Sequence, residues 1–232
     1  MTENKEKILA ILKKYYPKAK IALNYCNNWE LLVSVILSAQ CTDKMVNQVT
    51  GKLFLKYKNI DDYVNAKPEE FEKDIKSTGF FRNKAKNILA TAKIVKEKFK
   101  GKIPDTMEEL LTLPGVARKT ANIILGNAHN KVEGIAVDTH VHRISQRLRL
   151  VDMEKIGGKR KITFNREGEE IVDFIKDADP QKIEKELMNN LQKDEWFSIT
   201  YRIIDHGRSL CKAQNPNCAE CPLNKICASS RV

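Results

Sequence analysis

Apolar residues recur at the spacing of amphipathic helices along almost the whole chain, and strand-like alternation is scarce. Proline and glycine residues fall between these segments, where helices start or stop. The pattern therefore predicts an all-α fold. The expected helices cover residues 3–15, 29–40, 43–57, 60–65, 68–76, 81–99, 106–113, 116–128, 139–149, 167–176, 180–191 and 194–207.

A short turn joins the helices expected over residues 106–113 and 116–128. Asp105 followed by Glu108 has the spacing of a capping box that opens the first helix, and Pro114-Gly115 ends it. The first turn of the second helix has amide protons without partners in the helix, and the helix dipole adds positive charge there. Together these features predict an anion site, with the backbone of DNA or RNA as its ligand. The expected contacts are Gly115, Val116, Ala117 and Arg118.

Lys119 follows in the first turn of that second helix. The positive helix end and the neighbouring Arg118 both disfavour an ammonium group, so the amine is a candidate nucleophile. A lysine amine that attacks a sugar carbon can form a Schiff base. Taken alone, however, a lysine near a helix start is more often a solvated surface charge. The residue by itself does not separate these two interpretations.

The segment Val137-Asp138-Thr139-His140 follows the second helix after a short loop. Asp138 is placed to cap the next helix, which is a sufficient structural reason for an aspartate. The hairpin and this segment are more informative together than either is alone. A hairpin with lysine at the fifth position after its proline, followed by Val-Asp-Thr-His, resembles the endonuclease III family of DNA glycosylases. Members of that family have a Gly/Pro-rich loop before the aspartate, whereas this loop has Gly134 and no proline.

Four cysteines near the C-terminus have the spacing C-x6-C-x2-C-x5-C. Thiolates so close in sequence can wrap one metal centre. Zinc is the first alternative; zinc sites usually pair two Cys-x2-Cys elements and this run has one, so the spacing alone does not decide. The same spacing resembles the [4Fe-4S] cluster pattern of the endonuclease III family, and the resemblance implies this cofactor. The implied ligands are Cys211, Cys218, Cys221 and Cys227.

The resemblance also implies an arrangement of the chain. It implies two helical lobes that flank a DNA-binding cleft, one over residues 23–130 with the helix-hairpin-helix at about 106–128. The other lobe combines residues 1–22 with 131–232 and holds the C-terminal iron-sulfur cluster loop. On this expectation Lys119 comes from one lobe and Asp138 from the other, so that the cleft assembles the site.

Residues 151–177 are longer than ordinary loop lengths require, so they depart from the compact family pattern as an insertion. The segment is expected to be a small hairpin or a disordered basic loop. A solvated surface insertion is the simpler interpretation, because loops tolerate inserts readily. The basic run within residues 157–161 is in addition a candidate phosphate contact.

An enzyme that acts on a base inside a duplex must extrude that base and brace the gap that remains. Ser38-Ala39-Gln40-Cys41-Thr42-Asp43 resembles a family stretch whose glutamine enters this gap, which nominates Gln40. Thr78 to Ala85 resembles a family loop with an apolar wedge, which here is Phe80, with Phe81 as the other candidate. Core packing explains two successive phenylalanines equally well.

The resemblance implies a bifunctional DNA glycosylase and abasic-site lyase that acts on damaged bases, with oxidised pyrimidines as the usual substrates. Lys119 attacks the sugar carbon of the flipped nucleotide, and Asp138 assists deprotonation and stabilises charge that develops on the sugar. The base leaves, and the Schiff base permits β-elimination 3' to the abasic site. The cluster is expected to be structural and to hold a basic loop against DNA.

Two alternatives from other classes are weighed against this enzyme. The first is a nonenzymatic helix-hairpin-helix DNA-binding protein with a structural metal, in which Lys119 only contacts phosphate. The second is a mismatch-specific adenine glycosylase with the same fold and cluster. That branch requires a catalytic glutamate near residues 37–42 and has no lysine at the position of Lys119, and neither condition is met.

Charge supports a polyanionic partner, because 41 Lys and Arg residues outnumber 30 Asp and Glu residues and give a net charge of +11. The support is weak, since many proteins are rich in solvated lysines. With the motifs, it points to double-stranded DNA with damaged bases or abasic sites as the partner. A monomer is the default for an enzyme that slides along a duplex.

The start of the chain has no apolar core of a signal peptide, and the apolar run from Leu31 to Ala39 is too short to span a bilayer. We therefore expect no membrane partner and a cytoplasmic, nucleoid-associated or nuclear protein that is not secreted. A disulfide framework would require an oxidising compartment, which nothing in the sequence supports. Cys26 and Cys41 lie outside the cluster pattern and are expected to be buried small hydrophobic residues.

Overall fold

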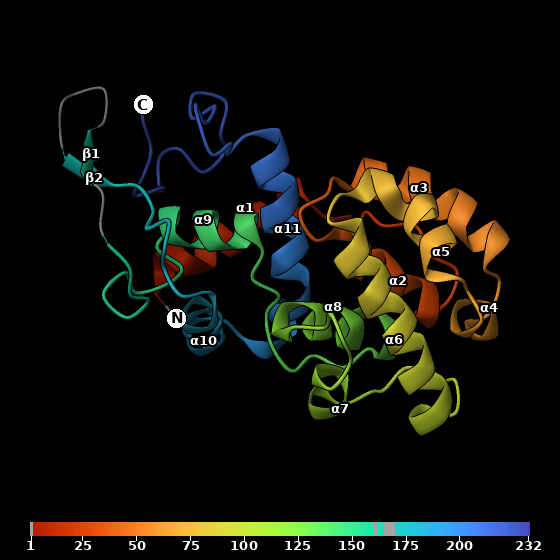
Figure 1. Cartoon of the computed structure of the whole chain (residues 1–232). Helices are drawn as coiled ribbons and strands as arrows, with labels where there is room; N and C mark the ends of the chain where they lie inside the picture. Colours follow the sequence, from red (N-terminus) through yellow and green to blue (C-terminus); the bar gives the residue numbers. More distant parts are fainter. Residues whose placement is uncertain (1, 160–161, 165–169) are drawn as a thin grey trace. The chain divides into compact units, whose positions relative to one another are not determined.

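A computed structural model describes residues 2–159, 162–164 and 170–232. Figure 1 shows that helices dominate, and the two short strands, β1 (Ile162–Phe164) and β2 (Glu170–Val172), pair as an antiparallel hairpin. The expected all-α class is confirmed with this small addition. The chain divides into two compact units, of which unit 1 combines Met1–Ile21 with Gly134–Val232 and unit 2 is Ala22–Glu133.

Unit 2 is built around one apolar helix, α2 (Asn28–Ser38). Every residue from Leu31 to Leu37 is buried, which is typical of a helix that is covered on all sides. It packs against α3, α6 and α8. The helices of this unit after α2 are α3 (Asp43–Lys56), α4 (Ile60–Val64), α5 (Pro68–Ile75), the 3-10 turn η1 (Lys76–Thr78), α6 (Phe81–Phe99), α7 (Met107–Leu111) and α8 (Arg118–His129).

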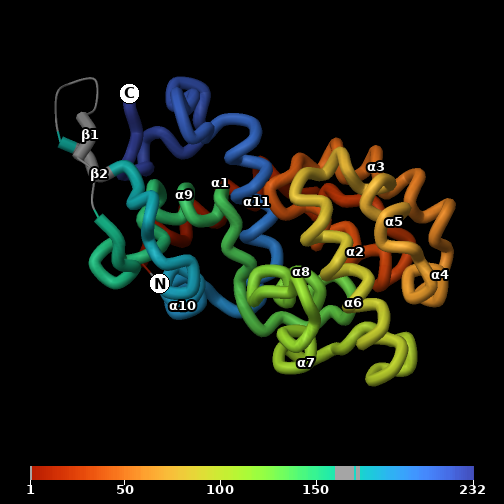
Figure 2. Tube along the Cα trace, viewed as in Figure 1, coloured from red at the N-terminus to blue at the C-terminus, as the bar shows by residue number. Residues whose placement is uncertain are grey.

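Unit 1 joins the two ends of the chain. Its N-terminal helix α1 (Glu3–Tyr15) packs against α11 (Trp196–Ser209), and the red and blue ends of the tube in Figure 2 both belong to this unit. Helix α11 also packs against α9 (Thr139–Arg147). Helix α10 (Pro180–Asn190) and the 3-10 turn η2 (Lys193–Glu195) precede α11, and an irregular loop follows it.

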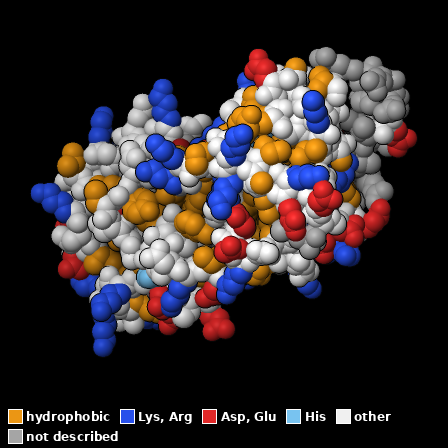
Figure 3. Space-filling model, turned by 180° about the vertical axis from the view of Figure 1, so that it is seen from behind, with side chains coloured by type: hydrophobic (Ala, Val, Ile, Leu, Met, Phe, Trp, Pro, Cys, Tyr) orange, Lys and Arg blue, Asp and Glu red, His pale blue; other side chains and the backbone are white. Residues whose placement is uncertain are grey.

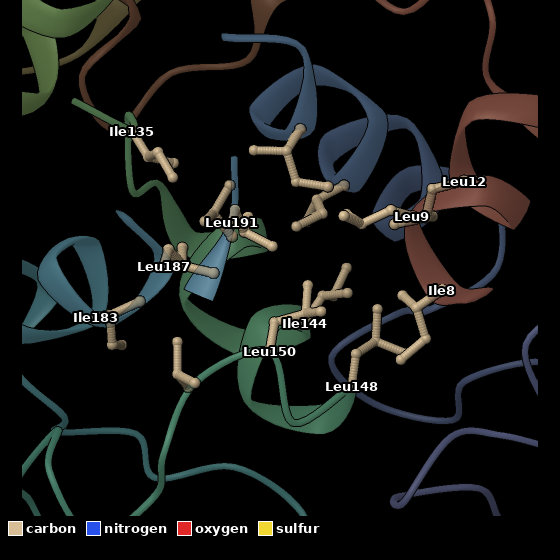
Figure 4. Packing of buried hydrophobic residues seen from close by; sticks show 14 of the residues in the cluster. Ile8, Leu9, Leu12, Ile135, Ile144, Leu148, Leu150, Ile183, Leu187 and Leu191 are labelled. Carbon is tan, nitrogen blue, oxygen red and sulfur yellow. The ribbon is translucent and has the colours of Figure 1, made fainter. Parts of the chain in front are cut away.

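Aliphatic side chains from helices far apart in sequence form the core of unit 1 (Figure 4). Each such side chain contributes about 1.5–3 kcal/mol when it is fully buried. The residues labelled in the figure are Ile8, Leu9, Leu12, Ile135, Ile144, Leu148, Leu150, Ile183, Leu187 and Leu191. This core holds α9, and therefore fixes the helix start at which Asp138 lies.

Local sequence explains most helix starts. Asn59 and Asp62 form a reciprocal capping box at α4, and Thr42 accepts a hydrogen bond from the Met45 amide at α3. The capping box expected for Asp105 and Glu108 is wrong by one residue. The side chain of Thr106 caps α7 and bonds to both the amide and the carboxylate of Glu109.

The helix expected over residues 167–176 is wrong. Residues 165–169 lie outside the described part of the chain, and Glu170–Val172 form strand β2. Of the two forms expected for the insertion, the strands correspond to the small hairpin. The three paired residues on each side satisfy backbone groups across the hairpin rather than along a helix.

Two further expectations need correction. The second helix of the hairpin motif begins at Arg118 rather than Val116, because Val116 still donates its amide to the Leu113 carbonyl at 3.1 Å within the turn. Cys26 and Cys41 are not buried; Cys26 is exposed and Cys41 is partly exposed. Both lie in the loops that flank α2, outside its buried span.

Candidate functional site

The turn between α7 and α8 is held against α6 at two points. Thr91 Oγ1 of α6 donates to the Pro114 carbonyl at 3.0 Å. Gly115 has φ of +81°, and a Cβ added there would come within 3.0 Å of Asn87 Nδ2. Only glycine adopts this conformation at low cost, and the exposed backbone is accessible to a ligand.

Ala117 is the N-cap of α8 in extended conformation. Its methyl group cannot accept a hydrogen bond, so the first-turn amides do not receive a side-chain cap from this residue. Such a helix start is suited to a phosphate oxygen. Val116 is buried beneath the turn, whereas Gly115 and Ala117 are exposed. The turn and the uncapped helix start that the sequence predicts are therefore present, with the helix start moved to Arg118, and the binding of an anion there stays a prediction.

Lys119 is the second residue of α8 and is exposed. It therefore lies beside the turn that is predicted to bind an anion, and its amine is accessible from solvent. Figure 3 shows Lys and Arg side chains spread over the visible face among exposed hydrophobic groups. Its position in the first turn of α8, directly after the hairpin turn, distinguishes Lys119 from an ordinary surface lysine.

Asp138 caps α9, as the sequence predicts. Its Oδ1 atom accepts the amide protons of His140 at 2.9 Å and Val141 at 2.7 Å. Within the described residues, Oδ2 of the half-buried carboxylate has no hydrogen-bond partner. The capping role fixes the direction of the carboxylate and leaves one oxygen for another group. Capping and catalysis are therefore compatible at this position.

Gln40 and Phe80 each lie in a loop of unit 2 and share an unusual backbone. Gln40 has φ of +52° and Phe80 has φ of +47°, values that cost a residue with a side chain on the order of 1 kcal/mol or more. Both side chains are exposed, and Phe80 retains 64% of its surface. An exposed phenylalanine with a strained backbone is not explained by core packing, which was the alternative interpretation for this residue.

All four cluster-pattern cysteines line one cavity in unit 1, together with Arg147 and His206. Burial raises the pKa of the Cys221 thiol, and it raises the pKa of Cys227 to about 11. Thiols with raised pKa values become ligands when a metal supplies compensating positive charge.

Among the described residues, no group of three His, Cys, Asp or Glu side chains could hold a single metal ion. Four cysteine thiols that line one cavity supply the donor set of a [4Fe-4S] cluster.

Two buried arginines of α9 support the cysteine loop, which is the irregular segment from Cys211 to Cys227 after α11. The sequence patterns did not single out these arginines. Arg147 donates from Nη1 to Cys211 Sγ at 3.3 Å and to the Lys212 carbonyl at 2.7 Å. Its Nε and Nη2 atoms bind the Asp173 carboxylate at 2.5 and 2.9 Å. Arg143, one helical turn earlier, donates to the Cys211 carbonyl at 3.0 Å. The four-residue spacing of two arginines on one helix was the available signal.

The structure places these residues in two groups. Unit 2 carries Gln40, Phe80, Lys119 and the hairpin turn. Unit 1 carries Asp138 and the cysteines. The expectation that a cleft between two lobes brings Lys119 and Asp138 together stays a prediction.

Comparisons with known proteins agree with these features. A family model described as HhH-GPD superfamily base excision DNA repair protein matches residues 33–172, and a model for the iron-sulfur binding domain of endonuclease III matches residues 211–227. Endonuclease III from a Synechocystis species is 44% identical over 225 residues, which cover 97% of this chain and 92% of the relative. No helix among the described residues is long and apolar enough to cross a membrane.

Solved structures agree as well. A non-covalent endonuclease III–DNA complex superposes with a TM-score of 0.83 at 39% identity, over 99% of this chain and 97% of the other. A trapped covalent endonuclease III–DNA intermediate gives the same TM-score, identity and coverage. With both family models, this similarity across nearly the whole length establishes that the chain belongs to the endonuclease III family of base excision DNA repair enzymes and carries a [4Fe-4S] cluster.

Proposed function

We propose that this DNA glycosylase and abasic-site lyase removes oxidised pyrimidines from duplex DNA and cleaves the strand through a Schiff base on Lys119. Membership of the family supplies the enzyme class, and the covalent DNA intermediate solved for a relative supports a nucleophile on the protein. The observation that carries the assignment to Lys119 is its exposed place beside the anion-binding turn.

The proposed steps need only the Lys119 amine, a proton acceptor beside it and water. The neutral Lys119 amine bonds to the anomeric sugar carbon, the glycosidic bond breaks, and the electron pair leaves with the base. The base takes up a proton from solvent. The nitrogen loses one proton, and its lone pair forms the C=N bond of the protonated Schiff base while the ring oxygen leaves and is protonated. Loss of the adjacent sugar proton to solvent then breaks the bond between the 3' carbon and oxygen, so the 3' phosphate leaves by β-elimination, and water hydrolyses the Schiff base to release the lysine.

Asp138 is proposed to accept a proton from the Lys119 amine and to stabilise positive charge on the sugar. The hydrogen bonds from two backbone amides to Oδ1 hold the carboxylate in one direction, and Oδ2 is the oxygen proposed to accept the proton. Asparagine is also a good N-cap, so Asp138→Asn removes the charge and keeps the start of α9.

The remaining assignments concern binding. The turn from Gly115 to Arg118 is proposed to hold a phosphate of the damaged strand through backbone amides. Gln40 and Phe80 are proposed to occupy the gap left by the extruded nucleotide. Their exposure and fixed backbone conformations support this role.

The proposed cluster ligands are Cys211, Cys218, Cys221 and Cys227, whose side chains line one cavity. The cluster, when bound, ties the segments of an irregular loop together, which supports a structural role. Lys212 and Lys225 are exposed on that loop and are proposed to contact phosphates. We expect the enzyme to work where genomic DNA is found, at the nucleoid or in the nucleus.

The test is borohydride trapping on duplexes that contain an abasic site or thymine glycol. The native protein is expected to form a covalent adduct on both, and Lys119→Gln on neither. Asp138→Asn should trap the abasic site and lose most base removal. Lys98→Gln changes an exposed lysine in the last turn of α6 and should behave like the native protein. Undiminished trapping by Lys119→Gln would show that another residue is the nucleophile.

A further inference from the structure

We propose that Lys84 is a positioning residue that fixes the Gln40 and Phe80 loops relative to each other before DNA binds. Lys84 lies in the first turn of α6 and is buried, with 5% of its surface exposed. Its Nζ atom donates to the Leu37 carbonyl at 2.8 Å and to the Thr78 carbonyl at 2.7 Å. One ammonium group therefore joins two separate segments of unit 2.

The two carbonyls stand immediately before the two loops. Leu37 is in the last turn of α2, two residues before the chain turns at Ala39 and Gln40. Thr78 ends η1, and Gly79 and Phe80 follow it. Each strained, exposed residue is thus two or three positions from a carbonyl that Lys84 binds. A change in the Lys84 bonds must alter both loops.

Burial of this lysine is costly, which makes a purely space-filling role a poor explanation. Lysine is almost never fully buried unless it is paired, and here its partners are carbonyls rather than carboxylates. Burial lowers the pKa of Lys84, and the nearby Cys41 acts in the opposite direction. A methionine would fill similar space without the desolvation cost. The carbonyl at the negative end of α2 favours a cation at this point.

A fixed spacing between the two loops has a direct use if both enter the gap in the base stack. Groups held in place before binding lose less conformational freedom when the complex forms. This inference rests on the roles proposed for Gln40 and Phe80. It predicts that Lys84 matters where a gap must be filled and not where the substrate has no opposite strand.

The experiment compares Lys84→Met, Lys84→Arg and Lys84→Gln with Lys86→Met, an exposed lysine of the same helix. Base removal from a thymine glycol duplex is measured beside borohydride trapping on a single-stranded abasic oligonucleotide. Lys84→Met should lower kcat/KM on the duplex by about 10- to 100-fold, since small misplacements cost that much. Trapping on the single strand should change by less than about threefold, and Lys84→Arg should recover part of the duplex activity because guanidinium can reach both carbonyls.

Equal losses on both substrates, or no loss on the duplex, would overturn the proposal. If Lys84→Met does not fold, Lys84→Gln and Lys84→Arg provide the same comparison. A double-mutant cycle with Gln40→Ala gives a second measure, because Gln40→Ala should cost little more once Lys84 has been removed. Native protein that fails to trap DNA would instead refute the proposed function, and harmless Gln40→Ala and Phe80→Ala variants would refute the loop roles.

Discussion

Gly115 shows how one residue controls the hairpin turn. Alanine at this position would keep an unfavourable φ near +81° and would press its Cβ against Asn87. We expect Gly115→Ala to destabilise the fold by about 1–3 kcal/mol and to weaken DNA binding, because the turn must shift away from α6. Urea unfolding and binding to an abasic duplex measure the two effects.

Gly51 provides the control for this change. It lies in α3 with nothing within 4 Å of an added Cβ, and no positive φ is recorded for it. Gly51→Ala should stabilise the protein by up to about 1 kcal/mol and leave DNA binding unchanged. Equal effects of the two substitutions would show that the conformation of Gly115 is not important.

Cysteine accessibility is a second prediction at this scale. With the cluster bound, a thiol reagent should modify exposed Cys26 first and partly exposed Cys41 more slowly. The four cysteines around the cavity should react only after the cluster is lost. Mass spectrometry of the labelled protein, with Cys26→Ser as control, identifies the sites. Reaction of all six thiols at one rate would contradict the assignment.

The sequence predicts the roles of some single residues and not those of others. Asp138 was expected as a cap because capping depends on neighbours in the chain. The exposure of Cys26 and the burial of Lys84 depend on which helices pack around them, and residue type points the wrong way for both. A buried lysine bound to two carbonyls has no local signature.

At the scale of elements, α6 supports several loops of unit 2 that carry the proposed DNA contacts. Phe80 is its N-cap, Lys84 binds the carbonyls near the Gln40 and Phe80 loops, and Thr91 binds the hairpin turn. Lys84 and Thr91 are two helical turns apart, so they lie on one face of the helix. One helix therefore sets where three separate loops begin.

Thr91→Val tests the link to the hairpin turn. The substitution removes the hydroxyl that binds the Pro114 carbonyl and should cost about 1 kcal/mol of stability, with weaker binding to abasic DNA. Thr50→Val is the matched control, since Thr50 is buried in α3 and its hydroxyl bonds within its own helix. Both variants should lose similar stability, but only Thr91→Val should lose DNA affinity. Equal affinity for DNA would refute the link.

The Arg147–Asp173 pair tests the support of the cysteine loop. Asp173→Asn leaves a buried guanidinium without its carboxylate, and we expect a loss of about 3–5 kcal/mol. The cluster absorbance should also decay faster on dilution in chelator. Asp61→Asn, which breaks an exposed ion pair with Lys96, should cost no more than about 1 kcal/mol. A stable cluster in Asp173→Asn would show that Arg147 holds the loop without its carboxylate.

Helix starts are predictable where caps are local, as at Asp43 after Thr42 and at Ile60 after Asn59, and the prediction fails where tertiary pairing decides. The segment around residues 167–176 combines apolar and charged residues in a way that suits a helix. Pairing of Ile162–Phe164 with Glu170–Val172 makes a hairpin instead. The pairing also places Asp173 directly after the strand, where it meets Arg147 from α9.

At the scale of the molecule, the basic character of the chain predicts strong salt dependence of DNA binding. Replacing Lys159, Arg160 and Lys161 together by glutamine should reduce the slope of log affinity against log salt by about 1–3, if the insertion contacts phosphates. Substitution is a cleaner test than deletion of residues 157–161, because Gly158 packs closely against Ile175 and Ala178. An unchanged slope would show that these basic side chains do not contact phosphates.

Periodicity alone says which segments are helical, but it does not say which ends of the chain pair. The apolar face of α1 is visible in the sequence, whereas its partners in α9 and α11 follow only from the structure. The resemblance to a known family supplied the two-lobe expectation.

The split composition of unit 1 has a consequence for biosynthesis. On the ribosome, α1 emerges before all of unit 2, and its apolar face must wait for α9, α10 and α11 to be translated. Unit 2 lies uninterrupted in the chain, so every helix it needs has been translated before α9 emerges. The cluster can gain all four cysteine ligands only after Cys227, which follows every helix of both units, has left the exit tunnel. A nascent chain stalled before α9, α10 and α11 have emerged exposes Ile8 and Leu12, and is therefore a natural client for chaperones.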